Sequence, residues 1–537
     1  MNEVLNNNFQ KLYPEIEETL KGATFLTLDS EFTGIKLHDE FKESLFDSNE
    51  DRYAKLRENI QPYIIIQIGI TAFRHSPNNN QYDAVGYNFY LLPRSVPFRN
   101  RTFLWQVSAL EFLSTYDFNF NKMAYNGIPY LNEKDQVLFK KHLFGNELLK
   151  NMNRDVSYRD EDELRDWGNR VSDWLNSKKS EEPTLRIKTI DPLLHYLMHK
   201  ELRIRFDDIW TLPGDNFIMV MKVDPSVRKI LEKEEGEALE NALLESYIGF
   251  SKVFKLLTTL KKPMIGHNML LDLMFMYQQF HKPLPKKYTE FKRDIHTFFP
   301  TIYDTKHISF ELRETLEREV KWKVNSLSGL YEYFRNGCGK FLSLNSPKVV
   351  LINRKDTDIE NYHNAGWDSY VAGYIFIKLA HKFAVDKFGV GMEKRAITST
   401  ELMNSVNNVK NCVNVIRGKL SYLRLDGCDP PTSRPQWLRV TPLRSKVVSA
   451  SQIAETLGNF GAVDVMPYSR RKILVAVANH GSARDILQHF RYNKELNIVP
   501  YNPIRHSIST RVFLWSGVIV SGGMLAWVLH RTLQKTV

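Results

Sequence analysis

The sequence predicts an α/β fold, followed by a smaller α+β domain and by one apolar helix near the C-terminus. Segments 25–32, 63–73 and 84–92 are rich in β-branched, aliphatic and aromatic residues, which is typical of strands. Between residues 437 and 500 the patterns alternate in the order βαββαβ. Segment 512–529 contains no charged residue and is about 27 Å long as a helix, which just reaches the thickness of a bilayer core.

The composition is that of a globular protein with sizeable cores. A length of 537 residues with 43% hydrophobic residues excludes the disordered and fibrous classes. The formal net charge of +11 is compatible with a polyanionic partner. The 3 cysteines fit neither a disulfide framework nor a zinc site, which favours a reducing compartment. No basic segment precedes an apolar stretch at the N-terminus, so we expect no cleaved secretory signal.

The early strands suggest a meander, and helical patterns follow them along the chain. These helical patterns occur at 160–179, 229–245, 245–280 and 368–388. The predicted segments are 1–155 for the first part of a core, 156–245 for an inserted module, 246–400 for the second part of the core, 401–436 for a linker, 437–503 for the βαββαβ domain and 512–529 for a transmembrane helix. The linker is suggested by the turn-rich stretch DGCDPPTSRP.

The order βαββαβ is that of an RNA-recognition motif, so we expect an RRM-like domain at 437–503. Ile473, Val475 and Val477 occupy the positions at which we expect the stacking aromatics of the third strand. The sequence therefore gives little reason to expect base stacking on this sheet. A small α/β packing module is the alternative interpretation.

Two carboxylates, Asp29 and Glu31, end the first strong strand in the segment LTLDSEF. Because side chains two apart in a strand project from the same face, these carboxylates lie side by side. Such a pair is costly unless a cation neutralises it. Taken alone, an Asp-x-Glu pair is more often solvated polarity at a strand end.

Three further candidates follow at the starts of two helices. Asp272 lies in the first turn of a helix among apolar neighbours, where an ionised carboxylate needs a partner or a cation. His363 lies just ahead of a second helix, and Asp368 lies in the first turn of that helix. Asp304 is either a further acid near the site or a turn residue.

Together the acids Asp29, Glu31, Asp272 and Asp368 are the ligand type that holds two hard divalent cations. Two such cations stabilise the attacking and leaving oxygens of an in-line phosphoryl displacement. His363 is placed to remove a proton from a nearby water. The pattern Asp-x-Glu, Asp and His-x₄-Asp resembles the DEDDh class of 3′-to-5′ exonucleases, whose core is an RNase H-like α/β sheet.

Longer motifs extend the resemblance over residues 1–382. They are LDSEFTGI, YNFYLLP, FNFNKMAYNGIPYLNEKDQ, IGFSKVF, KPMIGHNMLLDLMFMYQQFHKPLP, FFPTIYDTK and HNAGWDSYVAGY. These segments resemble the poly(A)-specific ribonuclease family, and the apolar C-terminal segment resembles its membrane-anchored branch.

This resemblance implies that Asp29, Glu31, Asp272 and Asp368 bind two Mg²⁺ ions, with Mn²⁺ as an alternative, and that His363 is the general base. It also implies contacts with the terminal nucleotides, at Phe32, Ile35, His267, Asn268 and Lys306. One departure concerns the inserted module, where HYLMHKELRIRFDD lacks the Arg-x-x-x-His signature of the family's middle domain. We therefore do not expect the insert to bind RNA in that manner.

The segment 512–529 predicts a tail anchor. Trp515 and Trp527 bracket it as interfacial aromatics do, and Arg511 and Arg531 flank it. Its short span suits the mitochondrial outer membrane, with the endoplasmic reticulum as the alternative. The body of the protein is then expected on the cytosolic side.

We therefore expect a metal-dependent 3′-to-5′ exoribonuclease that shortens single-stranded RNA and releases 5′-monophosphates. The resemblance to the membrane-anchored branch implies piRNA precursors held by a PIWI protein, a membrane-bound Tudor-type adaptor and a homodimer. One alternative is a general poly(A) deadenylase. Another is a non-catalytic, membrane-tethered RNA-binding adaptor, against which the complete set of acids argues.

Overall fold

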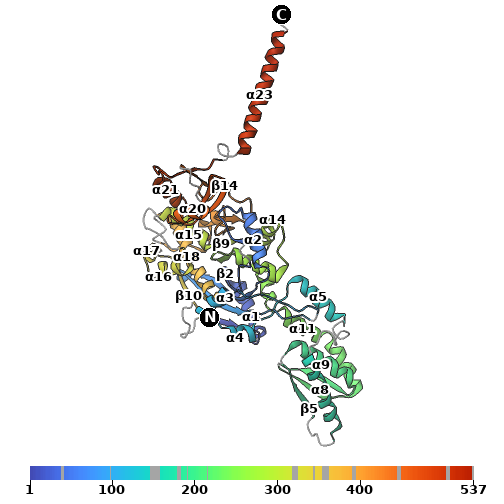
Figure 1. Cartoon of the computed structure of the whole chain (residues 1–537). Helices are drawn as coiled ribbons and strands as arrows, with labels where there is room; N and C mark the ends of the chain where they lie inside the picture. Colours follow the sequence, from blue (N-terminus) through green and yellow to red (C-terminus); the bar gives the residue numbers. More distant parts are fainter. Residues whose placement is uncertain are drawn as a thin grey trace. The chain divides into compact units, whose positions relative to one another are not determined.

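A computed structural model describes most of the chain (Figure 1). The described residues are 1–37, 41–96, 98–145, 158–177, 183–189, 191–214, 216–316, 325–342, 345–353, 362–389, 395–443, 449–502 and 508–534. They form two compact units. The large unit comprises residues 1–41, 56–414 and 424–427, and the small unit comprises residues 42–55, 415–423 and 428–537.

A seven-stranded mixed sheet forms the centre of the large unit. Its strand order is β1-β4-β3-β2-β8-β9, and β10 pairs with β4. The strands are β1 (Asn2–Val4), β2 (Phe25–Phe32), β3 (Ile65–Ser76), β4 (Gln81–Tyr90), β8 (Met264–Gly266), β9 (Ile302–Asp304) and β10 (Lys348–Leu351). Consecutive strands β2, β3 and β4 pair antiparallel, as the predicted meander requires, whereas β8 runs parallel to β2 and to β9.

Helices surround this sheet, and the longest packs on its central strands. The helices of the large unit outside the insert are α1 (Phe9–Gly22), α3 (Val107–Thr115), α4 (Phe120–Asn126), α5 (Glu133–Phe144), α12 (Ser251–Leu260), α13 (Leu270–Met276), α14 (Tyr288–Phe298), α15 (Thr305–Leu316), α16 (Leu327–Arg335), α17 (Gly339–Leu342), α18 (Ala365–Phe388) and α19 (Ser399–Ser405). A π-helical turn, Tyr277–His281, follows α13. The long helix α18 contacts β2, β3 and β4, and most of its side chains are buried.

A glycine allows the start of α18 to approach the sheet closely. Gly69 of β3 pairs with Asp29 of β2. A Cβ atom at Gly69 would lie 1.8 Å from the Ala365 carbonyl oxygen, so no other residue fits there without moving the helix. The Ala365 amide also donates to the Gln67 side-chain oxygen at 3.0 Å. These contacts fix the first turn of α18 against the strand that carries Asp29.

The predicted insert has a sheet and an apolar core of its own within the large unit. Its strands are β5 (Thr184–Lys188), β6 (Ile209–Pro213) and β7 (Phe217–Lys222), in the antiparallel order β5-β7-β6. Its helices are α8 (Tyr158–Asn176), α9 (Pro192–Arg205), α10 (Pro225–Glu235) and α11 (Ala238–Ile248). Leu164, Val171 and Met198 pack with strand residues in the core of this region.

The small unit contains the expected order βαββαβ. Its elements are β13 (Leu438–Pro442), α20 (Ala450–Gly458), β14 (Val463–Ser469), β15 (Lys472–Val477), α21 (His480–His489) and β16 (Leu496–Pro500). The four strands are antiparallel in the order β14-β15-β13-β16. The RRM-like assignment itself stays a prediction.

The register of β15 corrects one sequence expectation. Ile473, Val475 and Val477 pack with Ile453 and Ile486 of the helices in the core of the small unit, so they are not on a face available to bases. Because strand side chains alternate, the opposite face carries Leu474 and Ala476, and both are buried as well. The residues of β15 on this opposite face, Leu474 and Ala476, are not aromatic either.

The expected linker at 401–436 is wrong for its first part, whereas its turn-rich stretch 426–435 contains no helix or strand. The first part contains most of α19 and the strands β11 (Cys412–Asn414) and β12 (Tyr422–Arg424), which pair with each other. Leu402, Val406 and Val409 are buried in the main core of the large unit, so the first part of this segment belongs to that core.

The small unit also includes an early segment, residues 42–55, that the sequence did not assign to it. Part of this segment forms α2 (Asn49–Ile60), which continues into the large unit. The Lys419 amide donates to the Asp47 carbonyl at 2.7 Å, and the Arg52 guanidinium donates to the Ile416 carbonyl at 2.7 Å. The early segment is thus held by backbone groups of residues 415–423.

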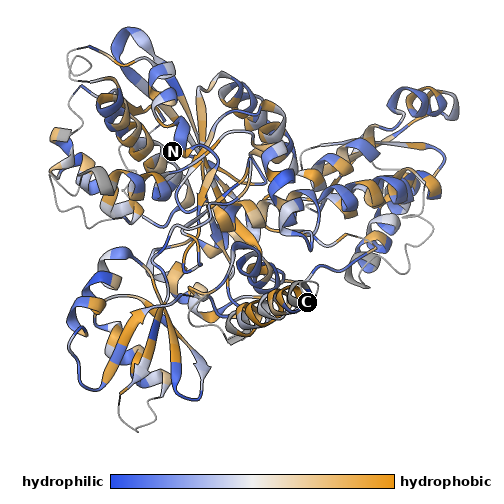
Figure 2. Cartoon of the chain, turned by 90° about the horizontal axis from the view of Figure 1, so that it is seen from above, coloured by the Kyte–Doolittle hydropathy of each residue, from blue (hydrophilic) through white to orange (hydrophobic). Residues whose placement is uncertain are grey.

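The C-terminal helix α23 (Ile508–Gln534) contains one stretch long and apolar enough to cross a membrane, Val512–Arg531. None of this stretch is buried. Figure 2 shows that α23 is apolar along much of its length and that the strands of the sheets are mostly apolar. The helix therefore matches the predicted span in position and length.

Candidate active site

The first two carboxylates of the candidate site lie at the end of β2. Asp29 is partly exposed and Glu31 is largely buried. A shift of register between Glu31 and Phe32 interrupts the pairing of β2 with β3. Burial raises the pKa of both carboxyl groups well above the ordinary values, and the charges of Asp368 and Asp272 raise them further.

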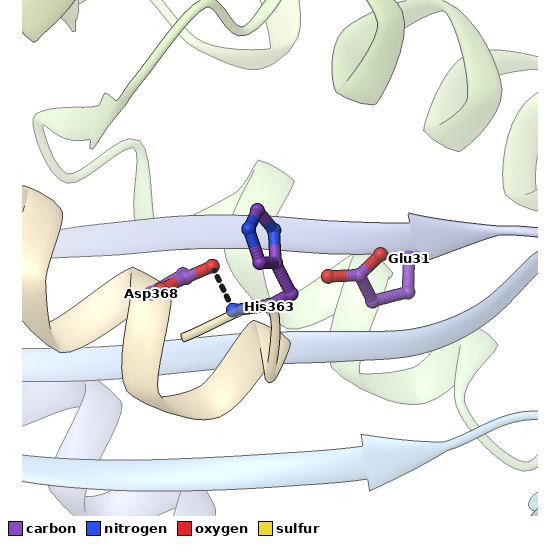
Figure 3. Close-up of side chains that lie close together, drawn as sticks. All are labelled: Glu31, His363 and Asp368. Atoms are coloured by element: carbon purple, nitrogen blue, oxygen red, sulfur yellow. Dashed lines mark hydrogen bonds between the residues drawn. The ribbon is translucent and has the colours of Figure 1, made fainter. Parts of the chain in front are cut away.

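The first turn of α18 supplies the next two residues. The Asn364 side chain caps the helix by accepting a hydrogen bond from the Trp367 amide. His363 precedes this cap with φ of 63°, and its amide donates to Asp368 Oδ2 at 3.0 Å. Figure 3 shows this hydrogen bond, with Glu31 on the side of the histidine ring away from Asp368. The bond fixes the loop and the carboxylate relative to each other.

The fourth carboxylate, Asp272, lies in the first turn of α13 and is buried. Burial raises its pKa to about 7, and the charge of Asp304 acts in the same direction. Burial also raises the pKa of Asp368 to about 7, while the His363 amide opposes that shift. The four acids are thus crowded, poorly solvated and in electrostatic contact.

Ligand atoms of Glu31, His363 and Asp368 all lie within 4.8 Å of one another. Among the residues that the structure describes, Asp368 Oδ1 is buried and has no hydrogen-bond partner. A buried carboxylate oxygen without a partner is costly and is relieved by a cation. The donor set is rich in carboxylate oxygens, which fits a hard divalent ion such as Mg²⁺ or Mn²⁺.

Two aromatic residues that sequence reasoning missed hold the His363 ring. The ring centroid of Tyr116 lies 4.0 Å and that of Phe112 4.7 Å from the imidazole centroid. Both aromatics belong to α3 or to its C-cap. Burial lowers the pKa of His363, so the neutral imidazole is favoured near neutral pH. No motif in the sequence connects α3 with His363, and only the fold reveals the contact.

The expected nucleotide-contacting residues lie in two places. Phe32 stacks on Phe275 of α13 with ring centroids 4.4 Å apart, and Ile35 is exposed. His267 accepts or donates a hydrogen bond with the Thr305 hydroxyl at 3.0 Å, and burial lowers the pKa of His267 to about 3. That these three residues contact RNA stays a prediction.

Asn268 and Lys306 are organised around the carboxylate of Asp304. Asp304 is fully buried, and its oxygens accept backbone hydrogen bonds from Asn268 at 2.8 Å, Lys306 at 3.0 Å, Met269 at 3.1 Å and Asn414 at 3.0 Å. Asn268 has φ of 64°, so this cage holds the turn that leads into α13. The structure supports the interpretation of Asp304 as a turn residue, and the effect of its charge on Asp272 also places it near the site.

Comparison with known proteins assigns the fold and the class of enzyme. The family model described as CAF1 family ribonuclease matches residues 4–376. The chain belongs to the CAF1 ribonuclease family. The pre-piRNA 3′-exonuclease trimmer of Bombyx mori is 35% identical over 535 residues, which cover 99% of both chains.

Two further relatives are similar over most of their length. The poly(A)-specific ribonuclease PNLDC1 of Mus musculus is 28% identical, with 98% of this chain and 99% of that protein covered. The poly(A)-specific ribonuclease PARN of Xenopus laevis is 26% identical, with 85% of this chain and 74% of that protein covered.

The CAF1 membership confirms the expected α/β exonuclease core, and with these relatives it confirms the expected 3′-to-5′ exoribonuclease. The sequence resemblance to the poly(A)-specific ribonucleases is confirmed as well. Dependence on a divalent metal ion, which is general among CAF1 nucleases, is consistent with the acidic cluster described above.

Proposed function

We propose that this chain trims the single-stranded 3′ ends of piRNA precursors and that Asp29, Glu31, Asp272, Asp368 and His363 form its active site. The observation that carries the proposal is the convergence of four crowded carboxylates and one histidine from β2, α13 and α18 in a CAF1 ribonuclease. An adaptor without catalysis has no need for such a costly cluster, so the enzyme is favoured over a tethered scaffold.

Two Mg²⁺ ions, or Mn²⁺ in their place, would be held by these four acids and would stabilise charge on the phosphate under attack. His363 has a lowered pKa and is therefore able to accept a proton from the attacking water. The Phe112 and Tyr116 rings restrict the imidazole, and the hydrogen bond from its backbone to Asp368 fixes the loop. The exposed Ile35 and the partly exposed Phe32 are proposed contacts for the last nucleotides.

The choice of substrate rests on the relatives. Similarity to the Bombyx mori trimmer extends over the whole chain, whereas similarity to PARN is lower and covers less of both proteins. We therefore favour piRNA precursors held by a PIWI protein over general deadenylation. A Tudor-type adaptor and a homodimer belong to the same proposal, and the RRM-like assignment of the small unit is supported by its βαββαβ order.

We further propose that α23 is a tail anchor, with the mitochondrial outer membrane as the favoured location. The exposed apolar stretch Val512–Arg531 supports an anchor, and its short length suits a thin membrane. In this proposal residues 1–511 lie on the cytosolic side of the membrane.

One assay tests the site and the substrate together. Wild-type protein receives free mixed-sequence RNA, poly(A) of equal length and precursor RNA loaded on a PIWI protein, each with Mg²⁺ or Mn²⁺. We expect similar rates on the two free RNAs, stepwise release of 5′-monophosphates and efficient trimming of the loaded precursor.

Matched variants separate catalysis from folding in the same assay. Asp272→Asn keeps the shape of the side chain and should abolish nucleotide release while RNA binding persists. Asp173→Asn makes the same change at an exposed position of α8 and should retain full activity. Retained turnover in Asp272→Asn would refute the site, and strict preference for poly(A) would favour the deadenylase.

A further inference from the structure

The loop that follows β2, residues 33–37, is held by a side chain where a neighbouring strand is missing. The pairing of β2 with β3 ends at Phe32, and the loop carries Ile35, the exposed residue proposed to contact the last nucleotides. The backbone amides of Ile35 and Lys36 both donate to the side-chain oxygen of Gln106, at 3.1 Å and 3.2 Å. Because backbone amides need an acceptor, the Gln106 side chain takes the place that a strand would have.

Gln106 occupies a position at which glutamine is not a preferred residue. It is the N-cap of α3, where serine, threonine, aspartate and asparagine are favoured because their short side chains accept hydrogen bonds from the first helical amides. The Gln106 side chain makes no capping hydrogen bond, and its oxygen accepts from the loop instead. The longer side chain therefore serves the loop and not its own helix.

Further contacts fix the loop against the same residue. The Gln106 amide donates to the Thr33 carbonyl at 2.9 Å, so Gln106 contacts the loop with its backbone as well as its side chain. The Tyr63 hydroxyl donates to the Lys36 carbonyl at 3.0 Å. A Cβ atom at Gly34 would lie 2.5 Å from the Tyr63 ring and 2.8 Å from the Cβ atom of Gln106. The loop is thus closely packed on the N-cap of α3.

The helix that Gln106 begins also reaches the histidine of the proposed active site. Phe112 of α3 and Tyr116 at its C-cap lie against the His363 ring. The helix has 9 residues, which corresponds to about 14 Å. Its N-cap holds the loop that carries Ile35, and its other end holds the imidazole. One short helix therefore sets the position of both groups relative to each other.

We propose that Gln106 is a positioning residue for the terminal nucleotide of the RNA substrate. It acts through its two side-chain hydrogen bonds to the loop, which hold Ile35 where the last nucleotide binds. This inference rests on the proposed ribonuclease function, because Ile35 contacts substrate only in that function. The loop contacts the nucleotide equally before and during the reaction, so loss of the two bonds raises KM and leaves kcat nearly unchanged.

The test removes the acceptor oxygen and keeps the shape of the side chain. Gln106→Met has no carbonyl acceptor, whereas Gln106→Glu retains an oxygen acceptor at the same position. Steady-state kinetics use the full-length chain in detergent, with single-stranded mixed-sequence RNA and Mg²⁺. For Gln106→Met we expect KM to rise roughly tenfold, with kcat within about threefold of wild type. Gln106→Glu should restore most of the KM in salt that screens its added charge.

A double-mutant cycle with Ile35→Ala separates positioning from general destabilisation. Once the Ile35 side chain is absent, the loop has little left to position. Gln106→Met should therefore raise the KM of the Ile35→Ala enzyme by less than about twofold. Gln10→Met makes the same exchange at an exposed position of α1 and should change neither KM nor kcat.

A milder variant and a local measurement cover the case in which Gln106→Met lowers the thermal unfolding temperature. Tyr63→Phe removes one hydrogen bond to the same loop, keeps the ring and should raise KM by about two- to fivefold. Hydrogen exchange should be faster at the amides of Ile35 and Lys36 in Gln106→Met, while the paired amides of β2 keep their protection.

Three outcomes would overturn the inference. They are a KM for Gln106→Met equal to that of wild type, a rise in KM that is undiminished in the Ile35→Ala enzyme, and a loss of kcat without a change in KM. Failure of the proposed function is recognised separately, because wild-type protein would then release no nucleotides from any RNA.

Discussion

Replacing Asp304 by asparagine should destabilise the large unit severely although the side chain keeps its shape. The two carboxylate oxygens accept four backbone hydrogen bonds, two at each oxygen. An amide offers only one acceptor oxygen, and its NH₂ group faces two N–H donors in either orientation. Hydrogen bonds to a charged group contribute about 1.5–3 kcal/mol each, so the loss of two predicts about 3–6 kcal/mol.

Hydrogen exchange measures this effect at the affected groups. The amides of Asn268, Met269, Lys306 and Asn414 should exchange faster in Asp304→Asn, and chemical unfolding of the large unit should occur at lower denaturant. Asp173→Asn at an exposed site provides the control. Stability within about 1 kcal/mol of wild type would refute the reasoning. Activity that returns when Mg²⁺ is raised would instead identify Asp304 as a metal ligand.

Three further predictions follow from the active site and the tail. Phe112→Ala should lower kcat by roughly tenfold with little change in KM, because the substitution frees the His363 ring. Phe112→Tyr should restore kcat. Steady-state kinetics that show a change in KM alone would contradict this prediction. Without metal, the raised pKa values of Asp272 and Asp368, about 7 each, mean that the folded state binds extra protons between about pH 4 and pH 7. Stability of the metal-free protein should therefore fall as pH rises through this range. The increase in Tm caused by Mg²⁺ should be larger at pH 8 than at pH 5.5. Equal increases in Tm at the two pH values would count against the carboxylate site. Deleting residues 508–537 should give a protein that no longer sediments with membranes but still degrades free RNA, since none of the apolar stretch is buried; cell fractionation and a nuclease assay check both parts.

Local rules were enough to single out the four acids as candidates. Asp29 and Glu31 share a face because strand side chains alternate, and Asp272 and Asp368 stand out because each is an acid in the first turn of an apolar helix. Such signals depend only on neighbours in the chain. Their convergence follows from the meander and from the close approach at Gly69, which a single sequence does not reveal.

The features that sequence reasoning missed depend on contacts between distant segments. Phe112 and Tyr116 carry no mark of their contact with His363. The first part of the expected linker belongs to the large unit because Leu402 and Val406 are buried in a core supplied by other elements. The face of β15 was assigned incorrectly because all of its residues from Ile473 to Val477 are buried, which removes the alternation that normally reveals register.

The early segment 42–55 has a consequence for biosynthesis. This segment leaves the ribosome about 360 residues before its first partners at residues 415–423. At roughly 5–20 residues per second, that delay lasts on the order of 20–70 seconds. During this time β2, β3 and β4 can already pair, while Leu45 and its neighbours lack the residues of the small unit that are translated later. The small unit can therefore be completed only after the residues that follow 428 have been made, and a fragment that begins at residue 437 would lack Leu45 and residues 415–423 of this unit.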